Sequence, residues 1–507
     1  MQRAAERLPD DVDALKKIIA NHLQHIRLLE EQLRLERHRK FGASSEKHPG
    51  QGELFNEAEE ADAASPDSAP PAATETLTYT RTKPRGRKPL PADLPRIRIE
   101  YDLDASEKLC ACGCQLSLIG EERSEQLDII PAKMRVLVHV RKKYACKGCE
   151  ETVKTARRPR QPIPKSNASP GLLAHVAVAK YQDALPLHRQ EKIFRRSGIE
   201  LPRNTLAGWM LRCGELIQPL LNLLDDQIRE GPLIQCDETP VQVLKEPAKA
   251  TAAGKSYMWV RVGGLPDQKI VLYHYHASRS GEVASALLEG YRGYLQTDDY
   301  AGYHAVGNSA GISHLGCWAH ARRKFMEAKK SAPAGKKATK ADMALSYIGK
   351  LYAIERQAKG LEPQQRRRLR QSHSVPLLHE LRSWLDKTLH KVLPKGALGK
   401  ALGYLDRNWD KLTVYTEDGR LSIDNNSAEN AIRPFVIGRK NWLFSDTPKG
   451  ARASAALYSL IETAKANGLD PYVYLRQVFK ELPTAQTLVE IKALLPWNLN
   501  ADSLKAA

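Results

Sequence analysis

The chain lacks any apolar run as long as a membrane-spanning helix requires. Its first residues, MQRAAERLPDDVD, also lack the apolar core of a secretory signal peptide. We therefore expect a cytoplasmic protein with no membrane partner. Acidic residues are in deficit, with 59 Asp and Glu against 78 Lys and Arg, which leaves a formal net charge of +19. That excess predicts a polyanionic partner, most simply nucleic acid, although a ribosomal or membrane-surface role fits the charge alone.

Cysteine is scarce and clustered. Five of the eight cysteines lie in two groups, in the sequences CACGC and CKGC. In a reducing compartment this pattern favours metal binding over disulfides, because two thiolates from one tight turn can occupy adjacent corners of a tetrahedral zinc site. Four protein ligands leave no open position, so the Zn²⁺ would be structural, and buried free thiols are the alternative. The predicted ligands are Cys112, Cys146 and Cys149, with Cys110 ahead of Cys114 as the fourth.

The N-terminal segment, residues 1–48, carries apolar residues at heptad spacing from Val12 to Leu33. This spacing predicts a short coiled coil and hence a homo-oligomer. The alternative is an amphipathic helix packed on its own domain.

Residues 49–100 lose this periodicity and become rich in Ala, Pro and Ser, which predicts a disordered linker. Inside it, the sequence KPRGRKP resembles an AT-hook. Arg85 and Arg87 would meet the negative potential of a narrow DNA minor groove, while Gly86 allows close approach of the backbone. A solvated basic linker is the alternative.

A zinc-binding module is expected over residues 101–160 and a helix-turn-helix region over 161–228. Two amphipathic segments, LPLHRQEKIFRRSG and RNTLAGWMLRCGELI, flank a Gly-containing turn. The second segment opens with the predicted DNA-binding residues Arg203, Asn204 and Thr205. A plain helical hairpin is the alternative.

From Pro232 the pattern changes to strands. The runs LIQCDETPVQVL, YMWVRVGG and KIVLYHYH are followed by a helix, a strand, and a strand leading into a basic helix. The order β-β-β-α-β-α-β-α predicts an α+β, ribonuclease-H-like catalytic domain within a multidomain chain. We expect its first part over residues 229–330, a helical insertion over 331–420, its second part over 421–466, and a C-terminal helical tail over 467–507.

Three carboxylates fit this layout: Asp237 on the first strand, Asp298 just after the fourth, and Glu429 on a short helix that Pro434 ends or kinks. Phosphodiester chemistry uses two divalent ions about 3.5–4 Å apart, and Mg²⁺ or Mn²⁺ prefers carboxylate oxygens. Asp237 would bridge the two ions. Strand alternation puts Glu238 on the opposite face, whereas Asp299 remains an alternative to Asp298. A surface Glu429 is the alternative for the third carboxylate.

Basic residues around this site are candidates to contact DNA phosphates, which position a strand without reading its sequence. For His320, a structural role is the alternative. The candidates are His320, Arg322, Arg323, Arg433, Arg439 and Lys440.

Motifs in series over nearly the whole chain carry a family resemblance: FGASSEK, GEERSEQL, CDETPVQV, QTDDYAGY, GCWAHARRKF, DNNSAENAIRPFVIGRKNWLF and LLPWN. The chain resembles transposases of the insertion sequence sixty-six family. The resemblance implies a DDE triad at Asp237, Asp298 and Glu429, and binding of double-stranded DNA at the element's terminal inverted repeats and at the target. It also implies small companion proteins. The second motif departs from the family's usual Asp-Gly-Tyr, and the first cysteine group departs from CxxC.

The function that follows is a DNA transposase, which cleaves element ends in a metal-dependent step and then transfers the strand. Two alternatives remain from the sequence. One is a zinc-containing helix-turn-helix regulator without catalysis, and the other is a structure-specific nuclease.

Overall fold

The computed structural model describes residues 11–41, 134–145, 153–156, 159–249, 254–331 and 339–500. The chain divides into two units, Asp67–Ala156 and the combination of Met1–Pro66 with Arg157–Ala507. The predicted AT-hook residues Arg85 and Arg87 lie outside the described residues, as do the predicted zinc ligands. In the smaller unit, strands β1 (Lys143–Ala145) and β2 (Val153–Thr155) pair antiparallel.

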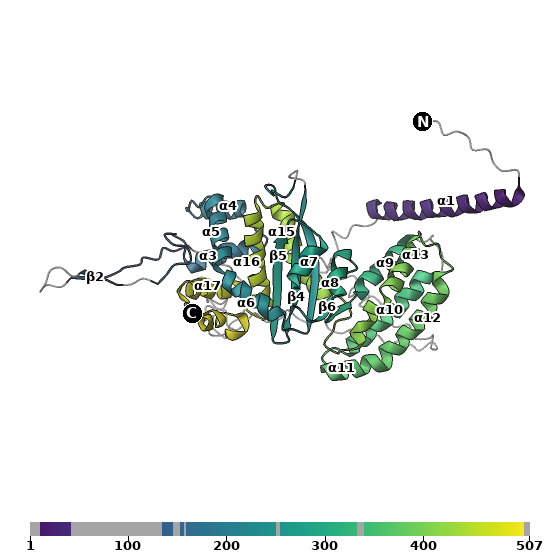
Figure 1. Ribbon diagram of the computed structural model, residues 1–507. Coiled ribbons are helices and arrows are strands. Elements are labelled where there is room, and N and C mark those ends of the chain that lie inside the picture. The colour runs from purple at the N-terminus through teal and green to yellow at the C-terminus, as the bar shows by residue number, and fades with distance from the viewer. Residues whose placement is uncertain are drawn as a thin grey trace, which may run out of the picture. The chain divides into compact units, whose positions relative to one another are not determined.

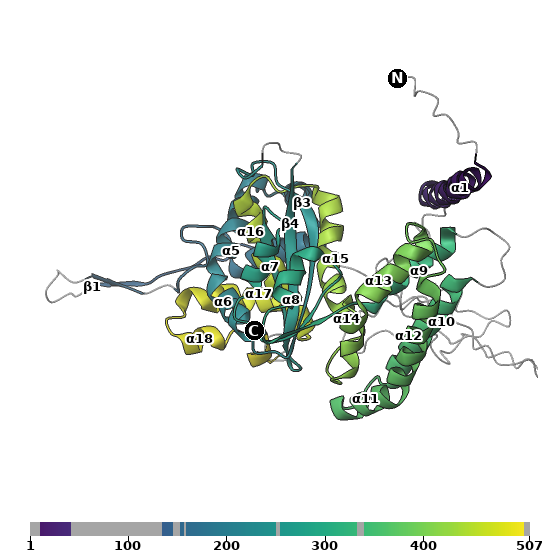
Figure 2. The same ribbon diagram turned by 45° about the vertical axis from the view of Figure 1, so that its right-hand side comes forward.

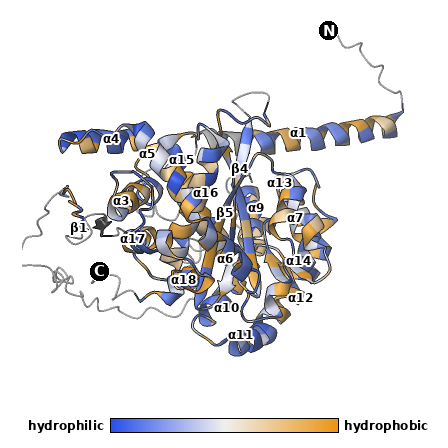
Figure 3. Cartoon of the chain, turned by 60° about the vertical axis from the view of Figure 1, so that its left-hand side comes forward, coloured by the Kyte–Doolittle hydropathy of each residue, from blue (hydrophilic) through white to orange (hydrophobic). Residues whose placement is uncertain are grey.

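The N-terminal helix α1 (Val12–Phe41) confirms the helical prediction for this segment. Figure 3 shows apolar and polar residues alternating along it. Its heptad residues Val12, Ile19, Ile26 and Leu33 are all more than half exposed. The single chain therefore leaves this apolar stripe uncovered, and the coiled coil stays a prediction.

A block of four helices precedes the sheet. The turn between the second and third contains Gly198, whose φ of 78° is favourable for glycine. The third helix buries Leu206 and Trp209 and exposes the three residues at its start, Arg203, Asn204 and Thr205. The predicted helix-turn-helix elements are thus present, while their contact with DNA stays a prediction. The helices are α3 (Pro170–Tyr181), α4 (Leu187–Arg196), α5 (Arg203–Leu216) and α6 (Gln218–Ile228).

The central element is a five-stranded mixed sheet in the order β5-β4-β3-β6-β7. The first three strands in sequence form an antiparallel meander, and β6 and β7 join parallel to β3. This agrees with the predicted order of elements and with an α+β class. The elements are β3 (Leu233–Gln242), β4 (Lys255–Leu265), β5 (Gln268–His276), α7 (Gly281–Leu287), β6 (Gly293–Gln296), η1 (Ala301–Tyr303), α8 (His304–Gly307) and β7 (Ile312–Leu315).

Helix α15 (Asn426–Trp442) excludes one of the two expectations for Pro434, because the helix continues past the proline instead of ending there. Proline removes one backbone donor from the helix interior. The neighbouring Ile432 and Phe435 are buried in the main core, and this packing holds the helix on both sides of the proline.

Side chains of helix α16 (Pro448–Ala466) hydrogen-bond backbone groups of the edge strand β5, against which the helix packs (Figure 1). The Thr463 hydroxyl accepts a hydrogen bond from the Val271 N–H at 3.0 Å and donates to the Val271 carbonyl at 2.9 Å. One turn earlier, the Ser459 hydroxyl accepts from the Tyr273 N–H at 2.7 Å. An edge strand presents unpaired backbone groups, and here side chains of a packed helix pair them.

The insertion is helical as expected. Together with α9 (Trp318–Ser331) it forms a second hydrophobic core. Figures 1 and 2 both show its helices gathered side by side. They are α10 (Lys340–Gln357), α11 (Pro363–Leu369), the π-helical turn η2 (Arg370–Ser374), α12 (Val375–Leu389), α13 (Ala397–Arg407), α14 (Trp409–Thr413) and η3 (Val414–Thr416).

The C-terminal part is also helical, with α17 (Pro471–Glu481), η4 (Leu482–Thr484), α18 (Leu488–Lys492) and η5 (Pro496–Asn498). Among the described residues, no helix combines the length and the apolar character needed to cross a membrane.

Replacing Thr463 by Val should lower the free energy of unfolding by about 1–3 kcal/mol, because it leaves the buried N–H and C=O of Val271 without their partner. Chemical denaturation measures this. Thr484→Val is the control, since that hydroxyl bonds the Glu481 carbonyl at the surface, and it should change stability by less than about 0.5 kcal/mol. An equal loss of unfolding free energy in the two variants would contradict a role for Thr463 in pairing the backbone groups of the edge strand.

Candidate active site

Three carboxylates come from three different elements. Asp237 lies in the middle of β3, Asp298 follows the end of β6, and Glu429 lies in the first turn of α15. Burial raises the pKa of Asp237 most, and the charge of the adjacent Glu238 comes next. The charges of Asp298 and Glu429 raise it further. Burial also raises the pKa of Glu429 most, and the charges of Asp424 and Asp298 add to that rise. The three carboxylates therefore act on one another electrostatically, and a metal site shared by all three stays a prediction.

A pair of buried glutamines aligns the two aspartates. Gln235 and Gln296 are register partners in the parallel pairing of β3 with β6, and the Gln235 amide donates to the Gln296 side-chain oxygen at 2.6 Å. Each glutamine stands two residues before an aspartate, Asp237 or Asp298. Asp237 therefore shares a face of β3 with Gln235, and Asp298 lies two residues after Gln296, just past the end of β6.

The segment before α15 is fixed to the same strands. The Asn425 side chain donates to the Cys236 carbonyl at 2.8 Å, next to Asp237. The Asp424 carboxylate accepts from the Tyr352 hydroxyl of α10 at 2.9 Å, and the Asp424 carbonyl accepts from Gln235 at 3.0 Å. Asp424 therefore supports the site from the insertion side and positions the helix that carries Glu429.

Glu238 has a different role from Asp237. Its side chain is 1% exposed, forms an ion pair with Arg279, and accepts from the Tyr303 hydroxyl at 2.6 Å. Directly opposite residues in antiparallel strands share a face, so Asp237, Val260 and Tyr273 form one row. The Tyr273 hydroxyl of that row bonds the Ala431 carbonyl of α15. Asp237 thus faces the helix of Glu429, and Glu238 faces the other side, as strand alternation predicts.

Arg279 connects Glu238 to the loop that carries Asp298. Its guanidinium carbon lies 3.6 Å from the centre of the Tyr300 ring, and its carbonyl accepts from the Tyr300 hydroxyl. The Tyr300 backbone N–H in turn donates to Asp298 Oδ1 at 2.9 Å. The neighbouring Asp299 lies 3.7 Å from His304, and the choice between the two aspartates stays a prediction.

Burial dominates the electrostatics of Glu429, which is 8% exposed. Desolvation raises its pKa to about 7, against a lowering effect of Arg323, whose guanidinium lies 3.8 Å from Oε2. Desolvation also raises the pKa of Asp237 well above its ordinary value. Two carboxyl groups that are costly to charge in the protein alone favour the binding of a cation between them.

His320 lies beside Glu429, with 3.5 Å between Nδ1 and Oε1. Burial and the nearby Arg323 lower the pKa of His320 to about 4, so the ring is neutral at pH 7 and the contact is not an ion pair. Neither of these two atoms has a hydrogen-bond partner among the described residues. The polar atoms are therefore available to a bound group.

Cys317 joins His320 and Glu429 in a group whose ligand atoms lie within 4.8 Å of one another. Burial raises the pKa of the Cys317 thiol, and its sulfur accepts a hydrogen bond from the Asn425 N–H at 3.3 Å. A protonated thiol that already serves as an acceptor is a poor ligand for a hard cation. Asp237, Asp298 and Glu429 offer the carboxylate oxygens that suit Mg²⁺, and the unpaired Oε1 of Glu429 fits that role.

The remaining predicted basic residues are spread along α9 and α15. Arg322 and Arg323 are half-buried on α9, and Arg433 is half-buried on α15. Arg439 donates to the Thr239 hydroxyl at 3.2 Å and to the Pro240 carbonyl, so it joins the end of α15 to β3. Lys440 is exposed.

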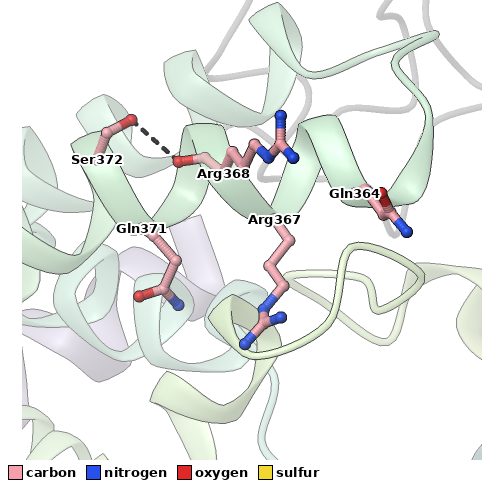
Figure 4. Close-up of a pocket in the computed structure, with 5 residues that line it drawn as sticks. All are labelled: Gln364, Arg367, Arg368, Gln371 and Ser372. Carbon is pink, nitrogen blue, oxygen red and sulfur yellow. Dashed lines mark hydrogen bonds between the residues drawn. The ribbon is translucent and has the colours of Figure 1, made fainter.

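A shallow polar pocket lies away from these carboxylates, on α11 and η2 (Figure 4). It contains no acidic residue, and its Ser372 hydroxyl donates to the Arg368 carbonyl at 3.0 Å. The candidate site is therefore the carboxylate cluster and not this pocket. The lining residues are Gln364, Arg367, Arg368, Gln371 and Ser372.

Sequence reasoning missed the supporting residues Gln235, Gln296 and Arg279. The two glutamines had a signal, since the same Gln-x-Asp pattern occurs twice, within β3 at 235–237 and at the end of β6 at 296–298. Arg279 had none, because its partner Glu238 is 41 residues away in the sequence.

Magnesium-free protein with its zinc retained should lose stability as the pH rises from about 4.5 to 7. The pKa of Glu429 is higher in the folded state, so the folded state holds its proton more tightly, and that advantage disappears once both states are deprotonated. The loss should be about 2–3 kcal/mol for this group, and Glu429→Gln should abolish it. Denaturation at several pH values measures the difference. The exposed Glu289→Gln variant should follow the wild type, and parallel curves for wild type and Glu429→Gln would contradict the assignment.

Arg279→Met should destabilise the protein by on the order of 3 kcal/mol, because it leaves the Glu238 carboxylate buried without its cation. The double variant Glu238→Gln with Arg279→Met should recover much of this loss, since the buried charge is gone. A double-mutant cycle by denaturation measures the coupling. Additive effects of the two substitutions would show that the pair does not act as a unit.

Comparison with known proteins identifies the family. The model described as "Transposase IS66 family" matches residues 165–453, and that of the "IS66 C-terminal element" matches 459–497. The "zinc-finger binding domain of transposase IS66" matches 107–150, which contains the predicted zinc ligands, and "Transposase C of IS166 homeodomain" matches 28–99.

Relatives in Sinorhizobium fredii (strain NBRC 101917 / NGR234) extend this match. The uncharacterized protein y4jD is 32% identical over 522 residues, covering 99% of both chains. The uncharacterized protein y4qI is 35% identical over 435 residues, covering 83% of this chain and 79% of its own. With its catalytic-region, C-terminal and zinc-finger segments all matched, the chain belongs to the IS66 (insertion sequence sixty-six) transposase family.

Proposed function

We propose that this protein is a DDE-type DNA transposase with a ribonuclease-H-like catalytic domain. It cleaves the phosphodiester backbone at the ends of a bacterial insertion sequence and transfers the freed strand to target DNA. The observation that supports the proposal is that burial raises the pKa of Asp237 and Glu429, and that the charge of Asp298 acts on both of them. The mixed sheet, with Asp237 on its first catalytic strand, supports the domain assignment.

Asp237 is central in this proposal, because the charges of both other carboxylates act on it. Asp298 and Glu429 each complete one side of the site. Bound Mg²⁺ or Mn²⁺ would supply Lewis-acid stabilisation of the attacking and leaving oxygens. The charge on Asp298 acts on Glu429, whereas Asp299 contacts His304, and this difference favours Asp298 over Asp299.

The protein's own groups also orient the DNA. Arg323 lies within 4 Å of Glu429 and His320 beside it, so both can meet a phosphate that enters the site. Farther away, the exposed start of α5 contacts element ends, and the basic linker around Arg85 and Arg87 follows a minor groove. The apolar stripe of α1 pairs two copies. Small companion proteins of the element complete the assembly, which acts on the bacterial nucleoid in the cytoplasm.

Strand cleavage on a labelled element end with Mg²⁺ tests the proposal. The wild type should cut at the element terminus, and Asp237→Asn and Glu429→Gln should lower the rate by at least about 10²- to 10³-fold with DNA binding retained. Asp298→Asn should behave like them, and the matched Asp299→Asn variant should remain active.

Cleavage that survives both Asp237→Asn and Glu429→Gln would overturn the choice of carboxylates. Cleavage of the DNA without any joining to a target would support a nuclease instead. Binding without cleavage by the wild type, even with the companion proteins added, would support a regulator.

A further inference from the structure

The far end of α15 presents large apolar side chains to solvent. Leu443 is 64% exposed, Phe444 44% and Ile437 48%. The exposed Lys440 lies one helical turn beyond Ile437. We name Ile437, Lys440, Leu443 and Phe444 the α15 tip.

The backbone of the α15 tip is strained. Leu443 has φ 66° and ψ −53°, and the Phe444 N–H donates to the Trp442 carbonyl at 2.8 Å. This hydrogen bond closes a γ-turn with positive φ, a rare and strained form for a residue with a side chain. Glycine would relieve the strain, yet the position carries a leucine. Because this leucine is exposed, its packing within the chain contributes little stabilisation to offset the strain. Strain of this kind concentrates at functional sites.

The chain after the turn is fixed to the end of β3. The Ser445 N–H donates to the Gln242 carbonyl at 2.9 Å, and the Leu244 N–H donates to the Ser445 carbonyl at 3.0 Å. Before the turn, Arg439 bonds Thr239 and Pro240 of the same strand. The α15 tip is therefore held rigidly on the strand that carries Asp237.

The distance along α15 from Glu429 to the α15 tip can be compared with the spacing of base pairs in duplex DNA. Leu443 lies fourteen positions after Glu429, which corresponds to about 21 Å along the helix. Stacked base pairs are spaced by about 3.4 Å, so this distance spans about six base pairs. Lys440 and the formal net charge of +19 favour a polyanion as the occupant over another apolar surface.

We propose that the α15 tip is a DNA-distorting wedge, in which Leu443 and Phe444 insert against a base-pair step about six base pairs from the cleaved phosphate. Apolar side chains inserted in this way partly unstack the step and bend the duplex. Lys440 neutralises a neighbouring phosphate. The placement rests on the proposed function, since it assumes that duplex DNA passes the carboxylates and then runs along α15.

Element-end duplexes with 2-aminopurine at successive positions within ten base pairs of the cleaved phosphate test the wedge, using the full chain. The wild type should raise the fluorescence at one or two adjacent positions by about twofold or more, because unstacking relieves quenching. The double variant Leu443→Ala with Phe444→Ala should lose this signal. Its DNA affinity should fall by about 5- to 50-fold, with an unchanged salt dependence because the phosphate contacts remain.

Two controls separate the wedge from a general loss of structure. Leu443→Gly should melt at or above the wild-type temperature, because glycine accepts positive φ, and should still weaken the fluorescence signal. Leu488→Ala with Val489→Ala removes another exposed apolar pair, on α18, and should leave the signal unchanged.

Four results would overturn the wedge. A wild type that binds and cleaves the DNA without any fluorescence rise would refute it and leave the proposed function standing. A signal that survives the double substitution would do the same. A double variant that instead changes its oligomeric state would make the α15 tip a contact between copies, and a wild type that binds no DNA would remove both proposals.

Discussion

The constraint on which this structure depends is the assembly of three carboxylates in a largely buried place. Burial and mutual repulsion raise the pKa of Asp237 and Glu429, so the fold must hold them against an unfavourable electrostatic energy. It does so with neutral amides close to the site, where Gln235, Gln296 and Asn425 bond across strands and to the start of α15. Neutral donors fix the geometry without neutralising the charges that a cation would bind.

Two hydrophobic cores stabilise different elements around this site. The larger one joins the sheet to α15 and α16, and the smaller one joins the insertion to α9. Their connection at the site is polar: Tyr352 of the insertion donates to Asp424, and α9 supplies His320 and Arg323 beside Glu429. The insertion therefore contacts the segment that leads to Glu429, although it lies between the two parts of this region in the sequence. Membership of the IS66 transposase family gives this architecture its biological setting.

Much of this could be predicted because local patterns carry it. Heptad spacing gave α1, alternating β-rich runs gave the strands around Asp237, and the helical insertion followed from composition. The end of α15 could not be predicted in this way, because Pro434 is a strong local signal for ending a helix. The burial of Ile432 and Phe435 on either side overrides it, and that packing depends on strands almost 200 residues earlier.

By itself the sequence determined a short set of candidate carboxylates, Asp237, Glu429 and either Asp298 or Asp299, because local patterns place them on a strand, on a helix and just after a strand. Only the tertiary structure decided how they are held. Strand register made Gln235 and Gln296 partners, and chain crossing brought Arg279 to Glu238 and Cys317 to Asn425. Such contacts join residues far apart in the chain, and their partners are set by packing and register, which no local pattern encodes.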